Sequence, residues 1–89
     1  MSEADRQVAN DVEVGYYYLR DKNYRAAESR LKEALELKPD SAAALVALAQ
    51  AQQKLGKRDD ARRSYDAYLK LDPNGADAEK VKKALAHLQ

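Results

Sequence analysis

Apolar residues recur along much of the chain at steps of three and four positions, which is the spacing of one face of an α-helix. Three segments carry this pattern, with apolar positions at Tyr24, Ala27, Leu31, Ala34 and Leu35, at Ala61, Tyr65, Tyr68 and Leu69, and at Ala78, Val81, Leu85 and Leu88. Residues 41–55 are rich in alanine and leucine and favour a helix by composition. No segment shows sustained alternation of period two. The pattern therefore predicts an all-α protein.

Prolines and glycines divide the chain into five expected helices. These are predicted at 5–20, 24–38, 41–55, 59–71 and 76–88. Pro39 and Pro73 each follow the end of a helix, and Asp40 or Asn74 is expected to cap the helix that comes next. Gly56 follows the third helix and suits the left-handed position just beyond a helix end.

The two prolines are 34 positions apart, and the chain repeats with that period. Placing residues 8–41 over 42–75 gives six identical pairs: Ala9/Ala43, Val12/Val46, Ala27/Ala61, Leu35/Leu69, Leu37/Leu71 and Pro39/Pro73. A helical hairpin of this length is too thin to bury its own apolar face, so hairpins stack on one another. We expect a single domain over 1–89, with one repeat at 8–41, a second at 42–75 and a capping helix within 76–89.

Each unit places small, aromatic and branched residues at matching positions before a closing proline. In the first unit these are Val14, Gly15, Tyr18, Tyr24, Ala27, Leu31, Ala34 and Pro39, and in the second they are Leu48, Ala49, Ala61, Tyr65 and Pro73. This set resembles the tetratricopeptide repeat (TPR) family. The resemblance implies antiparallel helical hairpins stacked as a right-handed superhelix, an α-solenoid of five helices.

Three residues depart from the family pattern. Asp11 stands where the family favours tryptophan, Gln52 stands where it favours an aromatic residue, and Tyr68 stands where it favours a small alanine. These departures imply looser packing in the second hairpin. The resemblance to the family covers residues 8–75, and the final helix looks like the extra helix that closes many such arrays.

Charge and hydropathy exclude several classes of partner. The chain has 16 basic and 15 acidic residues, a net charge of +1 that provides no field to hold nucleic acid or an anionic membrane. No apolar run approaches the roughly 18 residues of a membrane helix, and the polar amino end has no signal-peptide core. We expect a soluble chain, either cytoplasmic or a domain of a bacterial envelope protein.

A basic cluster near the second turn is interpreted as a solvated face, with contact to an acidic partner segment as the alternative. Its members are Lys54, Lys57, Arg58, Arg62 and Arg63.

Candidate chemistry is sparse. The chain has no cysteine, and its one histidine, His87, has no second histidine with which to form a metal site. No serine stands in a nucleophile-elbow context. We expect no catalytic residues, no metal site and no cofactor.

The resemblance implies a protein-interaction module that binds a peptide or protein segment in a concave groove, lined by the first helix of each repeat and by the last helix. The implied lining residues are Val12, Glu13, Tyr16, Leu19, Arg20, Val46, Ala47, Gln50, Gln53, Lys54, Lys80 and Ala84. Such a lining suits an amphipathic or extended apolar segment better than a highly charged one. Binding of chaperone tails is not expected, because the five positions of the family's carboxylate clamp are occupied by Val12, Tyr16, Ala47, Asp77 and Val81.

Alternatives stay open. One alternative to an interaction module is a structural or self-associating scaffold, natural or engineered. Another is the non-catalytic part of a larger enzyme. A weak homodimer is expected through the edge of the amino-terminal helix, where Val8, Tyr17 and Tyr24 leave apolar surface open. Among the three consecutive tyrosines, Tyr18 is expected to pack internally. Tyr17 either packs on a neighbouring helix or is exposed at that edge, and Tyr16 either lines the groove or covers Val12.

Overall fold

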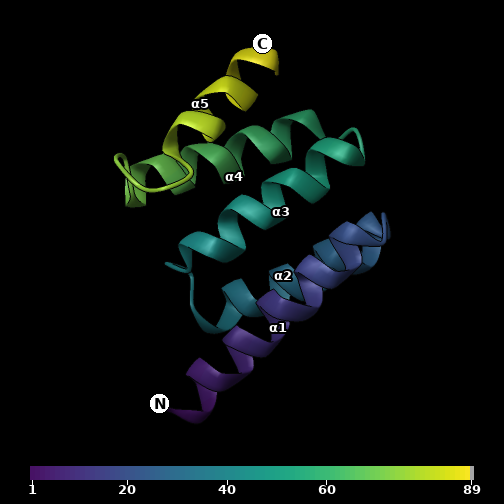
Figure 1. Cartoon of the computed structure of the whole chain (residues 1–89), viewed down its shortest axis with the longest axis vertical. Coiled ribbons are helices and arrows are strands. Elements are labelled where there is room, and N and C mark those ends of the chain that lie inside the picture. The colour runs from purple at the N-terminus through teal and green to yellow at the C-terminus, as the bar shows by residue number, and fades with distance from the viewer. Residues whose placement is uncertain (89) are drawn as a thin grey trace.

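Five helices make up the part of the chain that the computed structural model describes, residues 1–88, and no strand occurs in it. They are α1 (Glu3–Arg20), α2 (Tyr24–Leu37), α3 (Ala42–Lys54), α4 (Arg58–Leu71) and α5 (Ala78–His87). The helices stack in chain order along the long axis of the molecule, with the two termini at opposite ends (Figure 1). The predicted all-α fold of stacked helical hairpins is confirmed. Gln89, the last residue of the expected capping segment, lies outside the described residues.

The helix starts are fixed mainly by side-chain caps. The side chains of Ser2, Asn23 and Ser41 accept hydrogen bonds from the amides of Asp5, Ala26 and Ala44, at the starts of α1, α2 and α3. The expected caps at Asp40 and Asn74 are wrong. Ser41, one residue later, caps α3, and α5 begins after Asp77 with no side-chain cap.

The turns within the two hairpins share one backbone conformation, although their sequences differ. Gly56 has the expected positive φ, 78°, and Lys22, its equivalent 34 positions earlier, has φ 60°. In both turns this residue donates to the carbonyl three positions back, Leu19 or Gln53 (3.0 and 3.1 Å). The following amide then donates five positions back, to Tyr18 or Gln52 (2.8 and 2.9 Å). Lys22 thus adopts a left-handed conformation that costs an ordinary side chain about 1–2 kcal/mol.

Replacing Lys22 with glycine should therefore stabilise the fold. The strain relieved is about 1–2 kcal/mol, and the extra freedom of glycine in the unfolded chain returns roughly 0.5–1 kcal/mol of it. We expect Lys22→Gly to raise the free energy of unfolding by about 0.5–1 kcal/mol in urea titrations. Gly56→Ala, the reverse change in the equivalent turn, should lower it by about 1 kcal/mol. A loss of stability in Lys22→Gly would show that the lysine side chain itself stabilises the turn.

The core consists of two clusters on opposite sides of α3. One lies between α1, α2 and α3 and contains Val8, Ala27, Leu31, Ala34, Ala44, Ala47, Leu48 and Ala51. The other lies between α3, α4 and α5 and contains Leu45, Val46, Ala49, Ala61, Tyr65, Tyr68, Ala78, Val81 and Leu88. Because α3 contributes to both clusters, it is buried on two sides, which accounts for its nearly continuous apolar sequence from Ala42 to Ala49.

Small residues let the helices of each hairpin approach closely. Gly15 of α1 faces Leu31 of α2, and a Cβ at Gly15 would lie 2.7 Å from the Leu31 Cγ and Cδ2 atoms. In the second hairpin Ala49, fully buried, stands at the equivalent place, and Tyr65 stands where Leu31 does in the first. The pairing of a small residue with a large one thus sets the spacing of both hairpins.

The two departures from the family pattern in the second hairpin do not loosen it, contrary to expectation. The Gln52 side chain is 4% exposed and its Oε1 accepts a hydrogen bond of 2.7 Å from the Ser64 hydroxyl. The Tyr68 ring is 2% exposed, and its hydroxyl accepts from the Asp77 amide at 3.1 Å. Gln52 Oε1 and the Tyr68 hydroxyl therefore each have a hydrogen-bond partner within the second hairpin or the turn that follows it.

Asp11, the departure in the first hairpin, is a buried charge between α1 and α2. The residue is 1% exposed, and its Oδ1 accepts from Gln7 at 3.0 Å and from Arg30 at 3.4 Å. Its second oxygen, Oδ2, is buried without a partner in the described residues. An ion pair thus occupies the place where the family favours a large aromatic side chain.

The last helix is attached to α4 at both of its ends. The hydroxyl of Tyr68 holds the turn before α5, and Arg62 donates to the Leu88 carbonyl at 2.6 Å where α5 ends. Between these points Val81 is fully buried. The exposed side of α5 carries its charged residues, Glu79, Lys80, Lys82 and Lys83.

Of the helices in residues 1–88, none is both long enough and apolar enough to cross a membrane.

Candidate functional site: a groove across the stacked hairpins

A groove of about 710 Å³ is formed by side chains from all five helices. Its lining residues are Leu19 of α1, Tyr24 of α2, Gln50, Gln53 and Lys54 of α3, Tyr65 of α4, and Lys80, Ala84 and His87 of α5. We call this set the groove. Leu19 and Tyr24 flank the α1–α2 turn, and Gln53 and Lys54 end α3. The groove therefore joins both hairpins to the last helix.

Part of the groove follows the period of the sequence. Leu19, Gln53 and His87 are successive equivalents 34 positions apart, and Gln50 and Ala84 are equivalents as well. Their helices α1, α3 and α5 follow one another along the long axis of the molecule (Figure 1). The groove thus joins residues of these three helices with Tyr24 of α2 and Tyr65 of α4.

Six of the residues expected from the resemblance line the groove: Leu19, Gln50, Gln53, Lys54, Lys80 and Ala84. Three further residues, Tyr24, Tyr65 and His87, line the groove and were not expected there. Tyr65 is 3% exposed and belongs to the second core cluster, so its assignment to internal packing is correct. Tyr24 had also been assigned to internal packing, and His87 to the solvated carboxyl end. His87 could have been found from the sequence, because it is the third of the equivalents that start at Leu19.

Val46 and Ala47 do not line the groove, and the expectation for them is wrong. Val46 is 2% exposed and Ala47 is fully buried. Val46 belongs to the core cluster between α3, α4 and α5, together with Ala78 and Val81. Ala47 belongs to the cluster on the other side of α3.

The remaining expected residues, all on α1, lie outside the groove. Glu13 and Arg20 are exposed, and Val12 lines a separate hollow beside Val8. Tyr16 is half-buried against the first core cluster. Burial raises the pKa of its hydroxyl, and the nearby Asp77 carboxylate raises that pKa further. The Tyr16 hydroxyl is therefore protonated at neutral pH, and the choice between groove lining and cover for Val12 stays a prediction.

The edge expected to form a homodimer exposes less apolar surface than predicted. Val8 is buried, at 6% exposure, and Tyr24 lies in the groove. Tyr17 is 57% exposed, and its ring meets the edge of the Tyr18 ring at a centroid distance of 5.5 Å. Tyr18 itself is half-buried against the first core cluster. A weak homodimer through this edge stays a prediction, with Tyr17 as its main apolar contact.

The polar groups of the groove include two ammonium groups and a fixed side-chain amide. The Tyr65 hydroxyl donates to Gln53 Oε1 at 2.9 Å, which occupies one of the two acceptor positions of that oxygen. Burial raises the pKa of the Tyr65 hydroxyl, so this bond persists at neutral pH. Lys54 and Lys80 form no ion pair within the described residues, and none of the nine lining residues is acidic.

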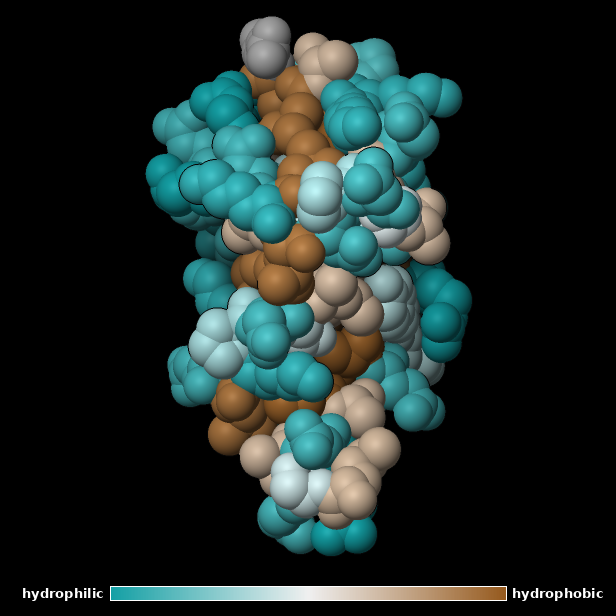
Figure 2. Space-filling view, turned by 90° about the vertical axis from the view of Figure 1, so that its left-hand side faces the viewer, coloured by the Kyte–Doolittle hydropathy of each residue, from teal (hydrophilic) through white to brown (hydrophobic). Residues whose placement is uncertain are grey.

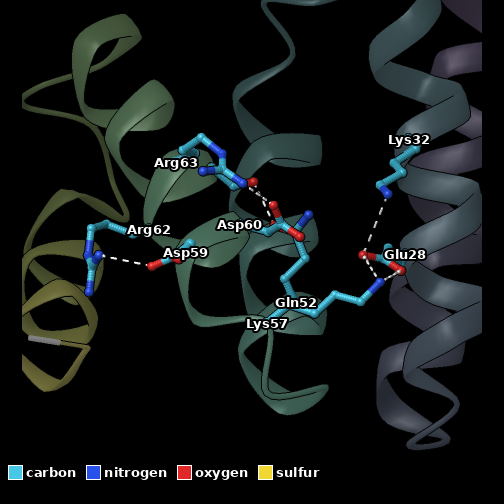
Figure 3. A network of polar contacts seen from close by, with 9 residues as sticks. Glu28, Lys32, Gln52, Lys57, Asp59, Asp60, Arg62 and Arg63 are labelled. Carbon is cyan, nitrogen blue, oxygen red and sulfur yellow. Dashed lines mark hydrogen bonds and ion pairs between the residues drawn. The ribbon is translucent and has the colours of Figure 1, made fainter.

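Most of the basic cluster near the second turn is neutralised by acids of the same chain. Lys57 Nζ lies 2.9 Å from Glu28 Oε1, and Lys32 Nζ forms an ion pair with Glu28 Oε2 at 3.7 Å. Figure 3 shows these two lysines converging on one carboxylate, with the pairs Arg62–Asp59 and Arg63–Asp60 beside them. Three of the five cations, Lys57, Arg62 and Arg63, are therefore already paired, which argues against this cluster as a binding surface for acidic partners. Only Lys54 of the cluster lies in the groove.

A second apolar surface lies on another side of the molecule. Figure 2 shows a band of hydrophobic side chains between hydrophilic ones, on the side where the α2–α3 and α4–α5 turns lie. Leu37 and Leu71, equivalent residues at the ends of α2 and α4, are 48% and 44% exposed.

Within residues 1–88, no group of three or more histidine, aspartate or glutamate side chains could hold a metal ion.

The family model of the tetratricopeptide repeat matches residues 18–88, which is most of the chain and spans the end of α1 through α5. The chain belongs to the tetratricopeptide repeat family. No curated protein matches it significantly. TPR domains generally act as protein-interaction modules. The groove, where the two hairpins and the last helix meet, is the candidate surface for such an interaction.

Proposed function

We propose that this TPR domain is a non-catalytic protein–protein interaction module that binds a peptide or protein segment in the groove. The observation that carries the proposal is the groove itself: one concave surface, of about 710 Å³, to which every helix contributes. Its volume lies within the roughly 300–1,000 Å³ typical of binding pockets. The family membership supports the same conclusion, because TPR domains typically bind proteins or peptides.

The lining chemistry favours a short segment with apolar anchors. Leu19, Ala84 and the ring of Tyr24 supply apolar area, and Gln50 and Gln53 supply hydrogen-bonding groups. Tyrosine rings are frequent hot spots because they bury a large area at low entropic cost. A segment with aliphatic side chains at intervals and a free backbone between them would use both kinds of group.

Substitution of Tyr24 tests the proposal. A peptide selected from a random displayed library on the wild-type domain should bind Tyr24→Ala about 5–30-fold more weakly, because about 1–2 kcal/mol of hot-spot contact is lost. Tyr17→Ala is the matched control, since Tyr17 is an exposed tyrosine outside the groove. Fluorescence anisotropy gives the affinities, and melting curves confirm that both variants fold. Weaker binding in Tyr17→Ala with full affinity in Tyr24→Ala would place the binding surface at the amino-terminal edge instead.

A further inference from the structure

The groove combines apolar surface with positive charge that the protein itself does not balance. Lys54 and Lys80 are exposed, line the groove from α3 and α5, and have no ion-pair partner within residues 1–88. His87 is the third basic side chain of the lining, and the lining contains no carboxylate. Lys57, three residues after Lys54, differs because its ammonium group forms an ion pair with Glu28 at 2.9 Å (Figure 3).

The amide of Gln53 adds a donor to the two lysines of the lining. The bond from the Tyr65 hydroxyl to Gln53 Oε1 orients this amide, so its NH₂ group is the donor that remains. Donors in a partly enclosed site need acceptors from the ligand, and carboxylates provide the strongest such bonds. An all-apolar segment would cover these donors without pairing them, which costs free energy.

We infer that the groove prefers an acidic segment, one in which glutamate or aspartate side chains alternate with aliphatic anchors. This inference rests on the proposed function and specifies its partner class. The attraction is local, since the whole chain carries a net charge of only +1. The residues involved differ from the five positions of the family's carboxylate clamp, which are occupied here by Val12, Tyr16, Ala47, Asp77 and Val81. The acidic side chains, rather than a chain terminus, are the recognised groups.

Three peptides test the inference. They share one length and one pattern of leucines, carry fluorescein, and have glutamate, glutamine or lysine between the leucines. We expect the glutamate peptide to bind the wild-type domain about 3–10-fold more tightly than the glutamine peptide at low salt, from two partly exposed charge pairs. The lysine peptide should bind most weakly, and the differences should shrink as salt screens the charges.

Variants assign the effect to the groove. Lys54→Gln with Lys80→Gln should lower the affinity of the glutamate peptide to that of the glutamine peptide, and leave the glutamine peptide unchanged. Lys83→Gln, on the exposed side of α5 and outside the groove, is the control and should have no effect. Equal binding of the glutamate and glutamine peptides would overturn the acidic preference while leaving the groove function intact. Binding of none of the three would overturn both, and equally tight binding of a labelled oligothymidine would overturn the assignment to a peptide.

Discussion

Leu31→Ala is expected to lower the free energy of unfolding by about 2–5 kcal/mol, the range for deleting a buried leucine side chain. Leu31 is fully buried at the centre of the first core cluster and fills the space beside Gly15. Removal of its side chain leaves a cavity between α1 and α2 that the rigid backbone of the hairpin closes only in part. Small domains have about 5–15 kcal/mol of stability in total. The variant should therefore melt far below the wild type in circular dichroism.

Two further variants separate packing from simple loss of a leucine. Leu37→Ala removes the same side chain from the same helix, where it is 48% exposed, and should cost less than about 1 kcal/mol. Gly15→Ala should cost about 1–3 kcal/mol alone, because its Cβ meets Leu31 at 2.7 Å. In the Leu31→Ala background that cost should fall, since the clashing atoms are gone. Equal losses in Leu31→Ala and Leu37→Ala would contradict the placement of the first core cluster.

Val46→Glu is expected to destabilise the fold by about 3–5 kcal/mol, the penalty for an uncompensated buried charge. Val46 is 2% exposed and lies against α5 in the second core cluster. Gln50→Glu introduces the same residue one turn later on α3, at a half-exposed position, and should change stability by less than about 0.5 kcal/mol.

The pH dependence of Val46→Glu identifies the cause of the loss. Burial raises the pKa of the introduced carboxyl above its ordinary value of about 4.3. The penalty is therefore full at neutral pH and shrinks as the pH falls towards 4.3, because the neutral acid is cheaper to bury. Urea titrations at several pH values measure it. If Val46→Glu is as stable as Gln50→Glu at neutral pH, α5 does not cover this position.

The fold could be predicted from the sequence because its signals are local and repeat. The steps between apolar residues set the helices, and Pro39 and Pro73 set the period of 34. The conformation of Lys22 could not be predicted in this way, because a lysine carries no signal for a positive φ. The shared hydrogen bonds of the two turns impose that conformation, and glycine meets it without strain only at Gly56.

The groove could be predicted in part. Repeat position alone cannot decide which residues are exposed, because equivalent positions have different neighbours along the stack. Val46 and Lys80 are such equivalents, yet only Lys80 lines the groove, since α3 is buried on two sides whereas α5 is the last helix. Tyr24 was missed for a different reason. A ring assigned to packing can still present one edge to a groove, and only the placement of the neighbouring helices shows it.

The most direct measurement of the central claim is a nitrogen-15 NMR titration of the domain with the library-selected peptide. We predict that backbone shifts change at the groove, with the largest changes at Leu19, Tyr24, Gln53, Lys54 and Ala84. Leu37 and Leu71, the exposed leucines at the ends of α2 and α4, and the exposed Tyr17 should stay unchanged. Shift changes confined to Leu37 and Leu71, or to the edge around Tyr17, with the groove residues unaffected, would contradict binding in the groove.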